Sequence, residues 1–392
     1  MRICLVTNEF PALTETFITT KALELRKRGH EVTVIKNQDN VVNASHVAQV
    51  KQAGIKVLAL NELHTKKGIG KAILSHPSIL IKAFSLSVSE FRKKFKQHLQ
   101  RKLLLERSYD IIHFEFSGLG VAYGNILDSL NAKLVVSCRG TAEKVKPVSE
   151  PNRKEQLKKL FSKVDGIHCV SQDMASTILP FCSDPAKIFV NRPSIDPGVF
   201  KRTKEYSPSP AGLQLLTIGR FTFQKGYLIG LMAMQQLRKE GVKFKWKIVG
   251  DGPLKEEIQY HIHALQLEDC VELLGKKNRD EIVELYNSVD VFLLPSFYEG
   301  IANVCLEAMS MELPVVSTKS GGMEEVIVHG ENGLLCEVYN PASIAENIKA
   351  LTQNPRYLKE LGVNARKTIL ERFTITRQVD VFEEQYSKLL KR

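Results

Sequence analysis

The sequence lacks the marks of secreted and membrane-spanning proteins. Its seven cysteines are scattered and include no Cys-x-x-Cys pair. No run of about 18 uncharged apolar residues occurs, and the apolar stretch at residues 3–6 is too short for the core of a secretory signal. These absences exclude a spanning helix and argue against a disulfide framework. We therefore expect a cytoplasmic protein with reduced cysteines.

Motifs of metal and cofactor chemistry are also missing. The chain contains no G-x-G-x-x-G loop, no H-E-x-x-H motif, no Walker lysine loop and no Asp-x-Asp pair. We therefore expect neither a metal ion nor an organic cofactor in the site.

The length and the charge of the chain limit its architecture and its partners. A chain of 392 residues exceeds what one hydrophobic core usually serves, so we expect two domains. The net charge of +12 leaves nucleic acid, anionic lipid and a phosphorylated substrate open as partners. Much of the excess lies between residues 64 and 107, where eleven Lys and Arg accompany two Glu.

Short apolar runs alternate with amphipathic segments in both halves of the chain. Such runs are typical of parallel strands that are buried on both faces of a sheet. They cover residues 3–6, 32–35, 111–114, 134–137, 167–170, 213–218, 244–249, 271–274, 291–294, 314–317 and 334–335. The alternation predicts an α/β protein with two doubly wound sheets.

A domain boundary is expected near residue 205, because two prolines and two serines follow at residues 207–210. We expect an N-terminal domain over residues 1–205 and a C-terminal domain over residues 206–375. Residues 376–392 form a last amphipathic helix, for which packing back on the N-terminal domain is one alternative. Because no flexible linker separates the domains, they should pack closely and leave a cleft.

The most informative stretch covers residues 295–309 and directly follows the expected strand 291–294. A strand, a turn and a helix start form an anion-binding geometry, because the first N–H groups of the helix have no helical acceptor. These groups belong to Ile301, Ala302 and Asn303. Glu299 lies in the turn and Glu307 lies about one turn inside the helix. The alternative to a functional role is that Glu299 is an acidic residue at the start of the helix and Glu307 a solvated helix residue.

A second stretch, residues 219–226, follows the expected strand 213–218 and reads Gly-Arg-Phe-Thr-Phe-Gln-Lys-Gly. Gly219 lets the backbone turn, and Arg220 and Lys225 can converge on one diphosphate. The alternative is that both are ordinary loop cations. Three further strand-end loops carry Gly250-Asp251-Gly252-Pro253, Gly275-Lys276-Lys277 and Gly321-Gly322-x-x-Glu325.

These stretches together resemble the family 4 glycosyltransferases, with their Glu-x7-Glu and Gly-Arg-x4-Lys-Gly patterns. The resemblance implies the GT-B fold, in which two Rossmann-like domains face a central cleft. It implies that Glu307 holds the donor ribose and that Glu299 faces the donor sugar. It also implies that Arg220 and Lys225 neutralise the leaving diphosphate. The nucleobase would lie near Lys277, and the loop at Gly250 would border the donor.

The first half resembles the family less closely. Residues 14–18 read Thr-Glu-Thr-Phe-Ile, a variant found in polysaccharide-assembly members. Capping of a helix over residues 15–28 by Thr14 and contact with the acceptor are equally open readings. Arg139 stands where the family commonly has His, and His113 at a strand end is either catalytic or a core histidine. The expected acceptor-side residues are Thr14, Glu15, Thr16, His113 and Arg139.

The resemblance implies a retaining, metal-independent transfer from a UDP- or GDP-sugar to a glycan or lipid-linked acceptor in cell-surface polysaccharide synthesis. No residue is placed obviously as a covalent nucleophile, which favours front-face transfer assisted by the leaving phosphate. The alternatives are a GT-B epimerase or phosphorylase, and a basic nucleic-acid-binding protein. We expect no nucleic-acid partner.

Residues 78–107 combine an apolar start with a strongly basic continuation. Apolar side chains recur there at three- and four-residue steps, which predicts a basic amphipathic helix. A solvated helix whose charges only aid solubility is the plainer alternative. Because the resembled polysaccharide-assembly members usually act on lipid-linked acceptors, we expect docking on the anionic inner face of the cytoplasmic membrane.

Overall fold

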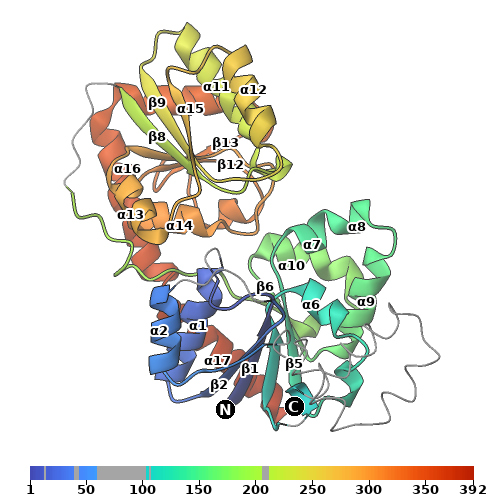
Figure 1. Cartoon of the computed structure of the whole chain (residues 1–392). Helices are drawn as coiled ribbons and strands as arrows, with labels where there is room; N and C mark the ends of the chain where they lie inside the picture. Colours follow the sequence, from blue (N-terminus) through green and yellow to red (C-terminus); the bar gives the residue numbers. More distant parts are fainter. Residues whose placement is uncertain (13–14, 39–43, 60–102, 106, 205–211) are drawn as a thin grey trace, which may run out of the picture. The chain divides into compact units, whose positions relative to one another are not determined.

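The computed structural model describes residues 1–12, 15–38, 44–59, 103–105, 107–204 and 212–392 (Figure 1). Their contacts form two compact units. Unit 1 comprises Met1–Val170, Met174–Asn191 and Val379–Arg392, and unit 2 comprises Ser171–Asp173 and Arg192–Gln378. The main passage between the units therefore follows Asn191, upstream of the boundary expected at residue 205.

The residues after Asn191 belong to unit 2 because their polar groups are bonded there. The Arg192 guanidinium donates to Glu325 Oε2 at 2.7 Å, and the Arg192 carbonyl accepts from Gln378 Nε2 at 2.8 Å. The prolines and serines at residues 207–210 predicted a boundary from the sequence, but they do not indicate which core the neighbouring residues join.

The sheet of unit 1 has the strand order β3-β2-β1-β4-β5-β6-β7, and all neighbouring strands are parallel. Its strands are β1 (Arg2–Thr7), β2 (Glu31–Lys36), β3 (Lys56–Ala59), β4 (Ile111–Phe114), β5 (Lys133–Cys138), β6 (Gly166–Cys169) and β7 (Ile188–Val190). The predicted runs form β1, β2, β4, β5 and β6, which is the buried centre of the sheet. The edge strands β3 and β7 were not predicted, because they are only partly buried and do not form long apolar runs.

Helices cover both faces of this sheet (Figure 1). Val136 of β5 packs with Leu160 and Gly120, which places α6 and α9 on one face. Gly166 of β6 packs against Leu389, which places α17 on the other face. The helices are α1 (Thr16–Lys27), α2 (Ala44–Gln52), α6 (Ser117–Ala122), α7 (Thr141–Lys144), α8 (Lys146–Ser149), α9 (Arg153–Lys163), α10 (Gln172–Ile178) and α17 (Ile375–Lys391). Within the described residues of unit 1, short 3-10 turns accompany them at η2 (Leu127–Ser129), η3 (Leu179–Phe181) and η4 (Pro185–Lys187).

The sheet of unit 2 is also parallel throughout and has the order β10-β9-β8-β11-β12-β13. Its strands are β8 (Leu213–Ile218), β9 (Phe244–Val249), β10 (Val271–Gly275), β11 (Val291–Leu294), β12 (Val315–Thr318) and β13 (Leu334–Cys336). Each of them falls on a predicted apolar run. From β8 the chain adds β9 and β10 on one side and then β11, β12 and β13 on the other, which is the doubly wound arrangement that the alternation predicts.

Successive side chains of the unit 2 strands enter two different cores. Leu215 packs with α11, α12 and α15, whereas Leu216 packs with α13, α14 and α16 on the opposite face (Figure 1). The elements are η5 (Phe223–Lys225), α11 (Tyr227–Lys239), α12 (Lys255–Ala264), α13 (Arg279–Asn287), α14 (Asn303–Ser310), η6 (Gly322–Glu325), α15 (Pro341–Gln353) and α16 (Pro355–Arg372).

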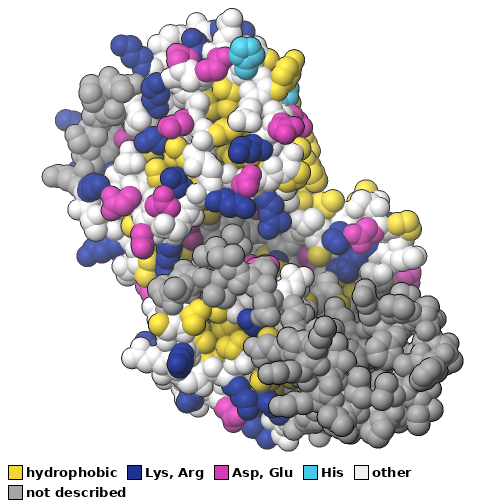
Figure 2. Space-filling view, in the orientation of Figure 1, with side chains coloured by type: hydrophobic (Ala, Val, Ile, Leu, Met, Phe, Trp, Pro, Cys, Tyr) yellow, Lys and Arg dark blue, Asp and Glu magenta, His cyan; other side chains and the backbone are white. Residues whose placement is uncertain are grey.

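Most of the basic segment at residues 78–107, together with Thr14, lies outside the described residues. On the face drawn in Figure 2, Lys and Arg lie interspersed with Asp and Glu. None of the described helices is long and apolar enough to cross a bilayer.

Candidate active site

The predicted donor-site residues of unit 2 lie in loops at the carboxyl ends of its parallel strands. Direct backbone bonds join these loops: Gly219 N donates to the Val249 carbonyl at 3.0 Å, and Gly250 N donates to the Gly275 carbonyl at 2.9 Å. Carboxyl ends of parallel strands meet at one edge of a sheet, where ligands of such folds bind. The structure therefore brings the loops of β8, β9 and β10 together.

Two glycines allow these loops to touch. A Cβ atom on Gly250 would lie 1.9 Å from the Gly219 carbonyl oxygen, and one on Gly226 would lie 2.0 Å from the Pro295 carbonyl oxygen. Gly226 also has a φ of +62°, which L side chains rarely adopt. Only glycine fits at either position, so the 219–226 loop packs directly on the loops of β9 and β11.

A buried ion pair joins the two motifs that the sequence singles out. Lys225 Nζ lies 2.7 Å from Glu299 Oε1, and the two side chains are only 13% and 9% exposed. Ser296 Oγ donates to the same carboxylate oxygen at 2.7 Å. The Glu299 carboxylate thus holds the Lys225 ammonium in place before any ligand arrives.

Backbone bonds fix the Glu299 turn on both sides. Glu299 N donates to the Ser320 carbonyl at 2.8 Å, and Gly322 N donates to the Glu299 carbonyl at 3.3 Å. Phe297 N donates to the Gln224 carbonyl at 2.7 Å, which ties the turn to the 219–226 loop. The Glu299 side chain is therefore carried by a rigid backbone.

Arg220 differs from Lys225 in its surroundings. Its side chain is exposed, and no ion-pair partner for its guanidinium occurs within the described part of the chain. A guanidinium at this position is free to bind a phosphate with two parallel hydrogen bonds. Within this motif, Lys225 is therefore neutralised by Glu299, whereas Arg220 remains available to bind a phosphate.

Helix α14 begins at the expected place, directly after the Glu299 turn. Within the described residues, the N–H groups of Ile301 and Asn303 have no acceptor, as the sequence predicts. Ala302 departs from the expectation, because its N–H donates to Met323 Sδ at 3.4 Å. The turn of η6 places that sulfur against the start of α14, and a thioether is a weak acceptor.

Glu307 lies half-buried on α14 and meets a tyrosine that the sequence did not single out. The Tyr286 hydroxyl lies 3.0 Å from Glu307 Oε2 and 3.0 Å from the Val304 carbonyl oxygen. Burial raises the pKa of the Glu307 carboxyl to about 7, although the Tyr286 hydrogen bond and the Arg279 charge oppose the shift.

Lys277 follows β10 in the loop that was expected near a nucleobase. Its ammonium lies 3.0 Å from Glu281 Oε1 in the first turn of α13. Lys277 also lines an open depression of about 650 Å³, to which Arg220, Glu299 and Glu307 do not contribute. Its ammonium is therefore engaged by Glu281 in this structure.

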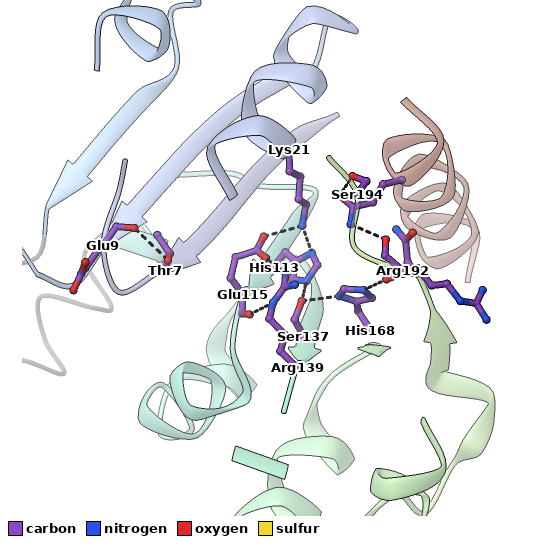
Figure 3. Close-up of polar contacts among 12 residues, drawn as sticks. Thr7, Glu9, Lys21, His113, Glu115, Ser137, Arg139, His168, Arg192 and Ser194 are labelled. Atoms are coloured by element: carbon purple, nitrogen blue, oxygen red, sulfur yellow. Dashed lines mark hydrogen bonds and ion pairs between the residues drawn. The ribbon is translucent and has the colours of Figure 1, made fainter. Parts of the chain in front are cut away.

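In unit 1, three charged side chains meet at the carboxyl ends of β4 and β5 (Figure 3). The Glu115 carboxylate is fully buried and accepts from Lys21 Nζ and from Arg139 Nη2, each at 2.7 Å. Burial by itself would raise the pKa of Glu115, but the Lys21 and Arg139 charges lower it. Burial lowers the pKa of Lys21 to about 8, against the opposing charge of Glu115.

A directed chain of hydrogen bonds runs through His168, Ser137 and His113 (Figure 3). The Asn191 carbonyl can only accept, so His168 Nε2, 2.7 Å away, carries a proton and its Nδ1 is an acceptor. Ser137 Oγ then donates to His168 Nδ1 at 2.8 Å and accepts from His113 Nε2 at 2.8 Å. This network assigns the Nε2–H tautomer to both histidines.

His113 is completely buried, and its Nδ1 faces Lys21 Nζ at 3.0 Å and the Tyr386 hydroxyl at 2.6 Å. Burial and the charges of Lys21 and Arg139 lower the pKa of His113 well below its ordinary value. Both ring nitrogens therefore have protein partners, and the ring is neutral at pH 7.

Arg139 contacts the segment at residues 14–18 through Phe17. Its guanidinium carbon lies 4.3 Å from the centre of the Phe17 ring, a cation–π contact. Glu15 precedes α1 without a side-chain capping bond, and the Thr16 carbonyl accepts from Thr20 Oγ1 at 3.0 Å. Within the described part of this segment, the cation–π contact with Arg139 is thus made by Phe17.

Several polar residues of the unit 2 site and of the buried network in unit 1 were not predicted from the sequence. They are Lys21, Glu115, Ser137, His168, Tyr286, Ser296 and Tyr386. One signal was available: Lys21 falls on the apolar stripe formed by Ile18, Ala22 and Leu25, where a cation requires a buried partner. The partner itself, Glu115, lies 94 residues away.

Comparisons with known proteins agree over almost the whole chain. The family description "Glycosyltransferase Family 4" matches residues 14–199, and "Glycosyl transferases group 1" matches residues 203–368. The putative colanic acid biosynthesis glycosyltransferase WcaL of Salmonella typhimurium is 25% identical over 95% of this chain and 96% of its own. The amylovoran biosynthesis glycosyltransferase AmsK of Erwinia amylovora is 28% identical over 67% of this chain and 66% of its own.

Solved structures show the same architecture. HepE from Anabaena, crystallised with UDP and glucose, superposes with a TM-score of 0.74 at 18% identity over 99% of each chain. Sucrose-phosphate synthase from Thermosynechococcus elongatus superposes with a TM-score of 0.78 at 16% identity over 100% of this chain and 99% of its own. With two consecutive family matches and two doubly wound parallel sheets, this chain belongs to the family 4 glycosyltransferases and has their GT-B fold.

Proposed function

We propose that this glycosyltransferase takes a sugar from a UDP- or GDP-sugar and transfers it, with retention of configuration and without a metal ion, to a glycan or lipid-linked acceptor. The observation that carries the proposal is the Lys225–Glu299 ion pair, together with the exposed guanidinium of Arg220 in the same 219–226 loop. A leaving nucleoside diphosphate accumulates negative charge in the transition state. Fixed cations and unpaired N–H groups at the start of α14 would stabilise that charge.

Glu299 would orient the site rather than attack the sugar. Its Oε1 atom is occupied by the Lys225 ammonium and the Ser296 hydroxyl, and both bonds reduce its nucleophilicity. Front-face transfer, in which the leaving phosphate assists the acceptor hydroxyl, accounts for retention without a covalent intermediate. The Glu307 carboxylate would hold the donor ribose.

The acceptor proposal depends on the named relatives. WcaL and AmsK are named for the synthesis of colanic acid and amylovoran, and HepE has been crystallised with UDP-glucose. We therefore place this enzyme in cell-surface polysaccharide synthesis, at the inner face of the cytoplasmic membrane.

A donor panel tests this function. The purified chain is incubated with UDP- and GDP-sugars, and released nucleotide is measured together with the anomeric configuration of any glycoside formed. We expect saturable release from one donor and a product of retained configuration. Failure of every nucleotide sugar to bind, or an inverted product, would contradict the proposal.

Activity should persist in excess EDTA. The Arg220 and Lys225 cations are expected to do the work that a divalent ion does in other transferases, so chelation removes nothing that the reaction uses. Turnover is measured with and without EDTA, beside a transferase known to require Mn²⁺. A loss of activity that added Mg²⁺ or Mn²⁺ restores would refute the cation-pair mechanism.

The enzyme should also cosediment with anionic vesicles through residues 78–107. Each Lys or Arg near such a surface contributes about 1 kcal/mol of attraction, which salt screens. Charge reversal at Lys93, Lys94 and Lys96 should weaken binding. A control with equal charge change reverses Lys239, Lys243 and Lys255, which are exposed in unit 2. Equal recovery of the wild type and the first variant from neutral and anionic vesicles would rule out the docking helix.

A further inference from the structure

The contact between Tyr286 and Glu307 poses a question of proton placement. Tyr286 is fully buried, and its hydroxyl carries one proton but faces two acceptors at 3.0 Å, Glu307 Oε2 and the Val304 carbonyl. If Glu307 is ionised, the hydroxyl can donate to only one of them. If Glu307 is protonated, it donates to the tyrosine oxygen, and the tyrosine donates to Val304. The protonated carboxyl therefore satisfies both contacts at once.

The burial of Glu307 favours the same protonation state. Burial raises the pKa of this carboxyl to about 7, and the charged or titratable groups that act on it are few. Tyr286 and Arg279 face it from α13, and both lower its pKa. Cys305 lies on its own helix and is completely buried. At pH 7 and below, Glu307 is thus neutral in a large fraction of the molecules whose donor site is empty.

Packing keeps the tyrosine in one position. Its ring contacts Phe200 and Phe292, with ring centres 6.2 Å and 6.0 Å away. It lies near the end of α13, a helix that Asn278 and Glu281 cap at its start. Because these contacts hold the ring, the Tyr286 hydroxyl keeps its position even if the Glu307 carboxyl moves.

We propose that Tyr286 is a positioning residue that holds Glu307 in either protonation state, and that donor binding releases the proton of this carboxyl. The inference rests on the proposed function, because it requires a nucleotide sugar whose ribose Glu307 binds. Two ribose hydroxyls that donate to one carboxyl need both of its oxygens as acceptors. A protonated carboxyl has one of them occupied by its own proton, so binding favours ionisation.

Donor affinity should decrease as the pH falls. The bound site requires the ionised carboxylate, while the empty site takes up a proton as the pH falls through about 7. Donor affinity should therefore be constant well above pH 7 and fall about tenfold for each pH unit below it. The released proton passes to the buffer.

Calorimetry with UDP-glucose and with GDP-mannose tests the coupling. Each phosphate of these probes has one ester and one anhydride bond and a single acidic oxygen that remains ionised, so the probe itself contributes no proton near neutral pH. Titration in MOPS and in imidazole buffers, which differ in ionisation enthalpy and contain no phosphate to compete for the site, counts the protons released. We expect most of one proton per bound donor at pH 6.5 and close to none at pH 8.5.

Two variants separate the roles of the pair. Glu307→Gln should release no proton and should bind with a weak affinity that does not change with pH. Tyr286→Phe removes the hydroxyl that contacts Glu307 in both protonation states. The midpoint of its affinity profile should therefore shift by about one pH unit. Tyr260→Phe is the matched control, because Tyr260 is exposed and should leave the profile unchanged.

The possible results are distinct. Binding that is independent of pH between 6 and 8.5, with no proton released, would overturn the inference and leave the donor proposal standing. A Tyr286→Phe profile identical to that of the wild type would overturn the role of Tyr286. Absence of binding by either probe at any pH would overturn the donor proposal and this inference together.

Discussion

Alanine at Arg220, Lys225 or Glu307 is expected to reduce turnover at least about a hundredfold, which corresponds to about 2.7 kcal/mol of lost transition-state stabilisation. Arg220 and Lys225 would contact charge that grows on the leaving diphosphate, so their loss should lower kcat as well as kcat/KM. Glu307 would contact the donor ribose, so its replacement should weaken donor binding more strongly. Single-turnover and steady-state kinetics with the preferred donor make the comparison.

The controls follow from the structure. Arg356→Ala removes an exposed cation of the same unit and should leave turnover unchanged. Lys225→Ala leaves the buried Glu299 carboxylate without its cation, so Lys225→Met is added to retain the packing. Thermal unfolding confirms that each variant is folded. Near-normal turnover in all three alanine variants would remove this site from the mechanism.

Glu115→Ala is expected to lower the unfolding free energy of unit 1 by about 3–5 kcal/mol. The buried Glu115 carboxylate compensates two cations, Lys21 and Arg139, and its removal leaves Lys21, which is only 2% exposed, without the charge that offsets its desolvation. Glu155→Ala is the matched control, because the Glu155–Lys158 pair is exposed and should contribute less than about 1 kcal/mol.

The measurement must report on unit 1 alone. Hydrogen exchange at the amides of β4 and β5 gives the free energy of opening around Glu115. The only tryptophan, Trp246, lies in β9 of unit 2 and serves as an internal reference by fluorescence. A cost below about 1 kcal/mol for Glu115→Ala, equal to that of the control, would show that the buried pair does not stabilise the unit.

Local pattern was sufficient for much of the fold. Central strands such as β1, β4 and β11 are buried on both faces, so each appears as an apolar run that needs no knowledge of its neighbours. The alternation with helices then determines parallel pairing, and parallel pairing brings the strand-end loops to one edge. This geometry, together with the resemblance to the family, is why residues 219–226 and 295–309 were predicted to form one site before their contacts were known. The edge strands β3 and β7 escaped because partial burial leaves no such pattern.

The pairing of charged side chains could not be predicted from the local sequence in the same way. A sequence shows that Lys225 and Glu299 are charged, but they stand 74 positions apart, and whether they neutralise each other depends on how the chain between them folds. The same holds for Lys21 with Glu115 and for the bond from Ala302 N–H to Met323.

What the sequence determined by itself was therefore the class of fold, the order of its motifs and the family. The tertiary structure decided which ionisable groups are buried, and hence their charge. It showed that Glu307, which we propose to bind the donor ribose, is a half-buried carboxyl beside Tyr286 rather than a solvated acid, and that His113 is a buried neutral ring. The physical reason is that side-chain identity is local, whereas desolvation depends on everything that packs around the group.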